Sequence, residues 1–408
     1  MDIITIIYTV MFFFGIYFLL LFILLYYENR KQLYSYPVPK RFPTITIITP
    51  AYNEEDSIAN TLKALVELDY PSEKKEIIVV NDGSHDRTVE IVKNLMKNHK
   101  EIRLLDKKNS GKADSLNQAI KMSKGELIAV VDSDSYPLKD SLIKMVGYFE
   151  EKNVAAVTSR VLVTNKTNFI EKFQAFDYVV IAWGRKILDF VGCVYVTNGP
   201  LSIYRRSQVL EVGGFDKNNI TEDIEITWHL LSKGYETKMS YSTAVYTIVP
   251  SKIKQWVNQR IRWNIGGLQT LYKYRSSFLR GRNLFGYFVI SYVSLAFFLA
   301  FIGFLLMFRY LALKFSSYAF SIPYILKGYN PFEFIEFNLP LTILFILGIL
   351  FLTLSLVYYK LALKNSDIKA KSIMSILIFI FIYRPLYLIP YLISIYRIIK
   401  GDVRWYTK

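Results

Sequence analysis

The sequence has few of the residues that build disulfide scaffolds or zinc sites. It contains one cysteine, Cys193, and three histidines, His85, His99 and His229, at unrelated spacings. A single cysteine excludes a disulfide framework. Scattered histidines do not provide the ligand spacing of a zinc centre. The chain also lacks internal repeats and low-complexity tracts, so a repeat architecture is not expected.

Charged residues are missing from several long stretches. Of the 408 residues, 52% are hydrophobic, and the mean hydropathy is +0.24. A helix needs about 20 apolar residues to cross a bilayer. The uncharged runs are Ile3–Tyr27, Leu284–Phe308, Phe337–Tyr359 and Ser372–Tyr396, the last broken by Arg384 and Pro385. We therefore expect a multi-pass protein of the cell membrane, surrounded by membrane lipids.

The first run is predicted to be an anchor. Asp2 precedes it and Arg30 and Lys31 follow it, whereas a secretory signal has basic residues first and a small-residue cleavage site. Basic residues favour the cytoplasmic side, so the segment after the anchor is expected in the cytoplasm. Three later crossings would leave the basic tail outside, against the same rule. Either the broken run is an interfacial or hairpin element, or Phe315–Leu326 crosses; we expect a cytoplasmic tail.

The chain is thus predicted to have five parts. These are a membrane helix (1–30), a cytoplasmic domain (44–250), an amphipathic interface region (251–282), C-terminal membrane segments (283–400) and a basic tail (401–408). The net charge of +16 is typical of proteins that meet nucleic acid, an anionic membrane surface or phosphate-bearing substrates. The membrane runs favour the last two, and no nucleic-acid partner is expected.

The 44–250 segment alternates short β-branched runs with helical patterns. Strands are predicted at 44–49, 76–80, 102–105 and 127–131, with helices near 57–68, 88–98 and 112–122. This alternation indicates βαβ units around a mainly parallel, Rossmann-like sheet. Ligands of such sheets bind beyond the carboxyl ends of the strands. Acidic turns follow three of these strands, at 49–55, 81–84 and 132–135.

Two acidic motifs have both a structural and a chemical interpretation. Asp132-Ser133-Asp134 is either a solvated turn or a pair of carboxylates for a nucleotide and a hard divalent cation. Thr221-Glu222-Asp223 opens a predicted helix, where Thr221 is a good N-cap and acids suit the first turn. A carboxylate held there is also suited to be a general base.

Three further segments have the same double interpretation. In 253–268 apolar residues recur at helical spacing, which places Gln259, Arg262 and Trp263 on the opposite face. That face is either bathed in lipid headgroups or directed at a ligand. Lys112 begins a predicted helix, where it is either a surface lysine or a contact for phosphate and sugar groups. Asn198-Gly199-Pro200 is either a plain turn or a turn at which the backbone can approach a ligand closely.

Taken together, these motifs resemble the family 2 glycosyltransferases. The likeness is to the membrane-embedded synthases of poly-N-acetylglucosamine, hyaluronan and cellulose, and it spans about 215 residues. It rests on the ordered set Thr-Pro-Ala-Tyr-Asn-Glu-Glu (49–55), Asn-Asp-Gly-Ser (81–84), Asp-Ser-Asp (132–134), Thr-Glu-Asp (221–223) and Gln-x-x-Arg-Trp (259–263). The 220–235 segment favours the poly-N-acetylglucosamine branch. The resemblance implies a glycosyltransferase-A-like α/β domain between membrane helices.

The resemblance also implies a role for each motif residue. The uridine and the nucleotide sugar would be held by Pro50, Tyr52, Glu54, Asp82, Lys112, Asp132 and Arg262. Asp134, with Asp132, would bind Mg²⁺ or Mn²⁺, and Asp223 would deprotonate the acceptor hydroxyl. The acceptor would lie against Gly199, Glu222, Gln259 and Trp263.

The implied reaction is an inverting, metal-dependent transfer from a UDP-sugar, with UDP-N-acetylglucosamine expected, to a growing β-linked polysaccharide coupled to export. The alternatives are transfer of one sugar to a membrane lipid and a non-catalytic glycan or lipid transporter module. Two residues depart from the family pattern. Asn81 stands where many relatives carry an Asp, which matters little if Asp82 is the contact, whereas Pro200 follows Gly199 where relatives have a small residue, which puts the acceptor geometry in doubt. A small accessory membrane subunit is a further partner that the resemblance leaves open.

Overall fold

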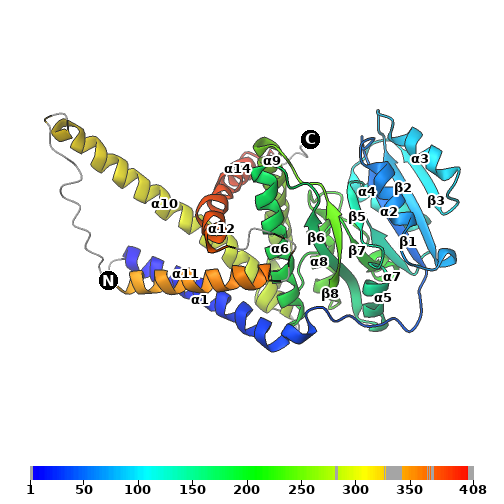
Figure 1. Ribbon diagram of the computed structural model, residues 1–408, viewed down its shortest axis with the longest axis horizontal. Helices are drawn as coiled ribbons and strands as arrows, with labels where there is room; N and C mark the ends of the chain where they lie inside the picture. The colour runs from blue at the N-terminus through cyan, green and yellow to red at the C-terminus, as the bar shows by residue number, and fades with distance from the viewer. Residues whose placement is uncertain are drawn as a thin grey trace.

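The computed structural model describes residues 3–280, 284–325, 327, 342–364, 366, 368 and 372–402. An eight-stranded sheet with the strand order β3-β2-β1-β4-β7-β6-β8-β5 lies at the right of Figure 1. The strands are β1 Ile45–Ala51, β2 Lys75–Asp82, β3 Ile102–Lys107, β4 Leu127–Val130, β5 Ser135–Pro137, β6 Val154–Val163, β7 Ser202–Arg205 and β8 Glu236–Thr247. The four strands predicted from the sequence are thus confirmed as β1 to β4.

The sheet has a parallel half and a mixed half. Strands β3, β2, β1 and β4 run parallel, with Ile45 opposite Lys75 and Leu127 in the two neighbours of β1. Strand β7 is antiparallel to both β4 and β6, β6 and β8 are parallel, and β5 closes the edge antiparallel to β8. The predicted α/β class with a mainly parallel sheet is confirmed.

Helices cover both faces of the sheet because alternate residues of a strand point to opposite sides. Ile45 and Ile47 of β1 pack in one core cluster, and Ile48 packs in another. The first cluster lies under α2 (Ile58–Val66), α3 (Thr88–Met96) and α5 (Ile143–Val146). The second lies under α4 (Lys112–Met122), α7 (Arg206–Glu211) and α8 (Glu222–Ser232).

Two long helices lie between the sheet and the apolar helices. Figure 1 shows α6 (Phe169–Asp189) in this position, and α9 (Ile253–Lys273) is the second. Helix α6 begins with a capping box, in which Asn168 and Glu171 satisfy each other's backbone N–H groups. On α9 the predicted apolar face is covered by protein, because Ile261 and Ile265 pack with Ile220.

Four helical stretches in the described part of the chain are long and apolar enough to cross a membrane, namely Ile3–Gln32, Phe285–Ser316, Ile343–Leu363 and Ile373–Ile399. The helices α1 (Ile3–Asn29), α10 (Ile290–Ile325) and α11 (Ile343–Leu363) extend away from the sheet (Figure 1). The stretch Phe315–Leu326, which the sequence offered as a possible crossing, is as far as Ile325 the end of α10 and forms no separate helix. Residues 337–341 of the third predicted run and residues 403–408 of the basic tail lie outside the described residues.

The broken run forms a nearly continuous helical segment that packs along α9. It consists of α12 (Ile373–Ile378), a π-helical turn, α13 (Arg384–Leu386) and α14 (Leu388–Ile399). The π turn precedes Pro385, which has no N–H to donate. Trp256 of α9 donates its indole N–H to the Tyr383 hydroxyl at 3.1 Å, and Ser394 donates to the Ile261 carbonyl at 3.4 Å. This segment therefore follows α9.

One buried carboxylate joins these elements. Asp177 on α6 has 0% of its side chain exposed, and its two oxygens face Arg260 of α9 at 3.7 Å and Arg384 of α13 at 3.5 Å. The Tyr387 hydroxyl also donates to it. The Arg260 side chain is 1% exposed, and its guanidinium lies over the Trp263 ring, 4.0 Å from the centroid. We call Asp177, Arg260, Arg384 and Tyr387 the junction cluster.

We expect Asp177→Asn to destabilise the protein strongly. The amide keeps the shape of the carboxyl group but leaves two guanidinium groups uncompensated, and removing one partner of a buried ion pair costs about 3–5 kcal/mol. Thermal unfolding of the purified protein in lipid nanodiscs measures the effect. The matched control is Glu67→Gln, whose partner Lys139 lies at 3.1 Å with both side chains more than half exposed; it should cost at most about 1 kcal/mol. Equal losses in the two variants would contradict the role of the cluster.

Candidate active site

The acidic turns after β1, β2 and β4 lie at one edge of the sheet, as the sequence predicted. Hydrogen bonds join the first two turns directly: the Asn53 N–H donates to the Ser84 hydroxyl at 2.9 Å, and the Glu54 N–H donates to the Thr88 hydroxyl at 2.9 Å. The His85 N–H donates in return to the Asn53 side chain at 2.9 Å. These bonds fix the turn that carries Pro50, Tyr52 and Glu54 against the turn that carries Asp82.

Asp82 is largely occupied by its own chain. Its carboxylate accepts the backbone N–H groups of Ser110 and Gly111, each at 2.9 Å, and the ammonium group of Lys107. These bonds hold the turn that precedes α4. Because a carboxylate offers about four acceptor positions, one remains for a ligand. Asp82 therefore mainly holds the turn before α4 in place, and little of its carboxylate is left to bind a ligand directly.

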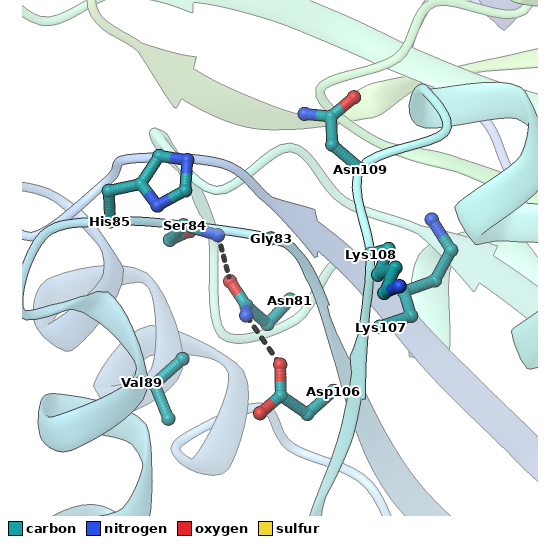
Figure 2. Close-up of a pocket in the computed structure, with 9 residues that line it drawn as sticks. All are labelled: Asn81, Gly83, Ser84, His85, Val89, Asp106, Lys107, Lys108 and Asn109. Atoms are coloured by element: carbon teal, nitrogen blue, oxygen red, sulfur yellow. Dashed lines mark hydrogen bonds between the residues drawn. The ribbon is translucent and has the colours of Figure 1, made fainter.

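A groove of about 530 Å³ opens beside this turn, at the ends of β2 and β3 (Figure 2). Asn81 lies at its base, where it donates to Asp106 at 2.6 Å and accepts the Ser84 N–H at 3.1 Å. Gly83 has a φ of 74°, and a Cβ there would lie 2.8 Å from the Asn109 nitrogen. Asn81, which departs from the family pattern, thus shapes the groove wall.

Lys112 connects the end of β4 to the start of α8. Its ammonium group lies 2.6 Å from Asp132 and 2.8 Å from Glu222. Gly199 packs against this pair, since a Cβ at that position would lie 2.8 Å from an Asp132 oxygen and 2.9 Å from the Lys112 nitrogen. Only glycine fits here without displacing the pair. The structure thereby brings together Lys112, Asp132, Gly199 and Glu222, which the sequence placed on four separate segments.

The two adjacent acids of α8 have opposite electrostatic environments. Burial opposes the charged form of Glu222, but the nearby charge of Lys112, its hydrogen bond and the charge of Arg262 outweigh burial and lower the Glu222 pKa. For Asp223, burial and then the negative charge of Glu222 raise the pKa to about 6. A carboxyl group tuned toward neutral pH beside an ionised one is typical of an acid–base site.

Thr221 does not cap α8 with its side chain, so that part of the sequence interpretation was wrong. Its hydroxyl donates instead to the Asn219 side chain at 3.2 Å, and Asn219 also accepts the Thr221 N–H at 2.9 Å. Asn219 in turn donates to Thr270 of α9 at 2.8 Å. The start of α8 is therefore fixed from α9. The side-chain cap was predicted from residue type alone, and residue type does not reveal a competing partner.

The remaining predicted residues line the side of the site that faces α6 and α9. Burial, followed by the charges of Asp134 and Glu54, raises the Tyr136 pKa. The Ser135 hydroxyl donates to Asp134 at 3.2 Å. Trp263 lies 6.4 Å from the Tyr178 ring of α6, centroid to centroid. Gln259 accepts a hydrogen bond from Arg260 at 3.1 Å.

The residues at the end of β4 fit a divalent cation that also takes ligands from a substrate. Among the residues that the structure describes, no three His, Cys, Asp or Glu side chains form a closed metal cage. Asp132 and Asp134 offer hard oxygen atoms, and Asp132 already pairs with Lys112. Mg²⁺ and similar cations are often held by one or two carboxylates together with phosphate and water.

Three residues near the site were not predicted. Arg260 and Asp177 belong to the junction cluster, and Arg185 donates to the side chain of Asn198, next to Gly199. Asp177 and Arg185 are charges within the largely apolar α6, and Arg384 interrupts an apolar run. Such charges require partners, but the sequence does not say which residue across the fold supplies them.

The family follows from comparison with known proteins. Residues 46–210 match the family model described as glycosyl transferase family 2. Poly-beta-1,6-N-acetyl-D-glucosamine synthase of Staphylococcus epidermidis is 31% identical over 294 residues, which cover 68% of this chain and 70% of that protein. The chain belongs to the family 2 glycosyltransferases. The synthase of the same name from Staphylococcus aureus strain MSSA476 is 32% identical over 265 residues, and this chain covers 64% of its length.

A solved structure shows the same fold. The mannosyltransferase PcManGT from Pyrobaculum calidifontis, in complex with GDP-Man and Mn²⁺, has a TM-score of 0.55 and 21% identity to this family 2 glycosyltransferase. The match covers 79% of this chain and 92% of the mannosyltransferase. The expected glycosyltransferase-A-like fold is thereby confirmed.

We expect kcat/KM to fall as the pH drops through about 6, because a general base must be unprotonated to accept a proton. Asp223→Asn should lose at least about 100-fold in rate, since general base catalysis contributes about 10²–10⁴-fold. Glu222→Gln should move the midpoint of the pH profile to lower pH, because it removes a negative charge that raises the Asp223 pKa. Initial rates from pH 4.5 to 8.5 measure both effects. A midpoint that Glu222→Gln leaves in place would contradict Asp223 as the titrating group.

Proposed function

We propose that this protein transfers a sugar from a UDP-sugar, with UDP-N-acetylglucosamine the expected donor, to a growing β-linked polysaccharide. The observation that carries the proposal is the placement of Asp223. Its carboxyl group has a raised pKa beside the Lys112–Asp132–Glu222 cluster, and α9 bears Trp263 next to α6. The names of the staphylococcal relatives support the donor and the polymer.

The reaction we propose is a single displacement. The Asp223 carboxylate accepts the proton of the acceptor hydroxyl while the hydroxyl oxygen forms a bond to the anomeric carbon of the donor. The bond from that carbon to the diphosphate breaks, its electron pair stays on the diphosphate oxygen, and the anomeric configuration inverts. Lys112 and Arg262 supply positive charge where the leaving group becomes more negative. A bound Mg²⁺ or Mn²⁺, held by Asp134 with Asp132, would add positive charge at the same diphosphate.

The donor nucleoside is proposed to bind at the joined turns after β1 and β2. Pro50, Tyr52 and Glu54 lie on one turn, and Asp82 and the Asn81 groove on the other. The acceptor would approach from the side of α6 and α9, along Gly199, Glu222, Gln259 and Trp263. An aromatic ring is a suitable surface for a sugar, because its face packs against the apolar C–H groups.

We propose that α1, α10 and α11 are the membrane crossings and that α12 to α14 lie along the cytoplasmic interface. The contacts of Tyr383, Arg384 and Ser394 with α9 and α6 support this placement. Three crossings put both the catalytic domain and the end of α14 in the cytoplasm. That topology agrees with the basic residues after α1 and α14. Export of the polymer through these helices is part of the proposal.

The size of the product tests the proposed function most simply. Purified protein in nanodiscs is incubated with Mn²⁺ and a panel of radiolabelled UDP-sugars, and the products are separated by gel filtration and by organic extraction. We expect a water-soluble polymer from UDP-N-acetylglucosamine that a β-N-acetylglucosaminidase degrades, and none from Asp223→Asn. A single labelled sugar in the organic phase would instead identify a lipid acceptor. Absence of any transfer would favour the non-catalytic alternative.

Metal dependence is a separate prediction. Protein stripped with EDTA should lose nearly all turnover and regain it with Mg²⁺ or Mn²⁺. Asp134→Asn should reduce turnover similarly, because an amide is a weaker ligand for a hard cation than a carboxylate. A matched control is Asp140→Asn, since Asp140 pairs with Lys144 at 2.5 Å on the surface. Full activity of the stripped wild-type protein would contradict the metal assignment.

A further inference from the structure

A second cavity lies on another side of α6 from the junction cluster. It has a volume of about 310 Å³ and is enclosed by the end of the α1 segment, β6, α6, β8 and the connection after α11. Its lining is Tyr34, Leu138, Arg160, Leu162, Val163, Lys166, Ala175, Val179, Ala182, Tyr241, Ala244, Tyr246, Ser366 and Ile368. None of these residues has a part in the proposed sugar transfer.

The cavity lies close to the ends of α1 and α11. Tyr34 follows shortly after α1, which ends at Asn29, and Ser366 follows shortly after α11, which ends at Leu363. Both helices end on the side of the catalytic domain (Figure 1). With α1 and α11 as the proposed membrane crossings, a ligand in this cavity would lie at the depth of the lipid headgroups.

The lining combines two cations with an apolar wall and no acid. The Arg160 guanidinium lies 4.8 Å from the centroid of the Tyr241 ring and donates through Nε to the Thr243 carbonyl at 3.1 Å. No ion pair joins Arg160 or Lys166 to a carboxylate within the described part of the chain. Ala175, Val179 and Ala182 recur along one stripe of α6 and leave the space that a hydrocarbon chain would fill.

We propose that this cavity binds an anionic phospholipid, with the phosphate between Arg160 and Lys166 and the start of one acyl chain along the small residues of α6. Basic pockets at the cytoplasmic ends of membrane helices bind acidic lipid headgroups. The apolar wall favours a lipid over a soluble anion, because a free phosphate would leave that wall without a partner. The cavity is smaller than a whole lipid, so the rest of the molecule stays in the bilayer. The proposal rests on the membrane placement above and is independent of the sugar donor.

The test measures lipid retention in the absence of any UDP-sugar. Full-length protein is exchanged into detergent with phosphatidylglycerol or phosphatidylcholine, and native mass spectrometry counts the lipids that remain bound. We expect one phosphatidylglycerol and no phosphatidylcholine on the wild type. The double variant Arg160→Gln/Lys166→Gln should bind phosphatidylglycerol about 30-fold more weakly, at about fivefold for each basic residue near an anionic surface. Lys172→Gln, which removes an exposed charge from the same helix, should bind as the wild type does.

Two further measurements keep the proposal falsifiable. Ala182→Leu fills the apolar end of the cavity and keeps both cations, so it should weaken binding of the two-chain lipid but not of glycerol phosphate. Glycerol phosphate at equal concentration should fail to displace the lipid; complete displacement would identify a soluble phosphate as the ligand and overturn the proposal. Equal retention by the wild type and the double variant would also overturn it. Because no sugar transfer is measured, failure here leaves the proposed function untouched.

Discussion

The structure depends on one carboxylate that cannot stand unpaired in the protein interior. Asp177 on α6 faces guanidinium groups from α9 and α13 at 3.7 and 3.5 Å, and it is the contact through which three separate segments are held in register. A buried charge without a partner costs several kcal/mol, so displacement of either arginine is opposed. Arg260 then lies against Trp263, and α9 is fixed across the end of the sheet.

This constraint accounts for the way the active site meets the membrane helices. Helix α9 carries Arg262 and Trp263, which we propose belong to the site, and it also positions the start of α8 through the hydrogen bond between Thr270 and Asn219. The start of α8 is therefore fixed by α9, while its body packs on the sheet. Lys112 links the two parts through its ion pairs with Asp132 and Glu222. The neighbouring acids have different environments: burial opposes the charge of Glu222 but Lys112 lowers its pKa, whereas burial and the charge of Glu222 raise the Asp223 pKa to about 6.

Much of the parallel half of the fold could be predicted from the sequence, because its strands and helices follow in a regular βαβ order. The predicted helix near 112–122 coincides with α4, and the turns at 49–55, 81–84 and 132–135 meet where strand direction places them. The antiparallel strands β5 and β7 have only three and four residues, too few to show a periodicity. Residue type correctly flagged Arg384 as unusual, but its pairing with Asp177 depends on tertiary packing that no local pattern encodes. Asp82 is a motif residue that the sequence pointed to as a uridine contact. Its structural part, as the acceptor that holds the turn before α4, could not be predicted from the motif.

The central claim is that Asp223 takes the proton of the attacking hydroxyl, on the face of the sugar opposite to the diphosphate. The most direct measurement is an electron cryo-microscopy structure of Asp223→Asn in nanodiscs with UDP-N-acetylglucosamine, Mn²⁺ and a short β-linked oligosaccharide. The account predicts that the terminal acceptor hydroxyl lies within hydrogen-bond distance of the residue 223 side chain, with the anomeric carbon between that hydroxyl and the diphosphate. An acceptor hydroxyl on the same side of the sugar as the diphosphate, or next to a different carboxylate, would contradict it.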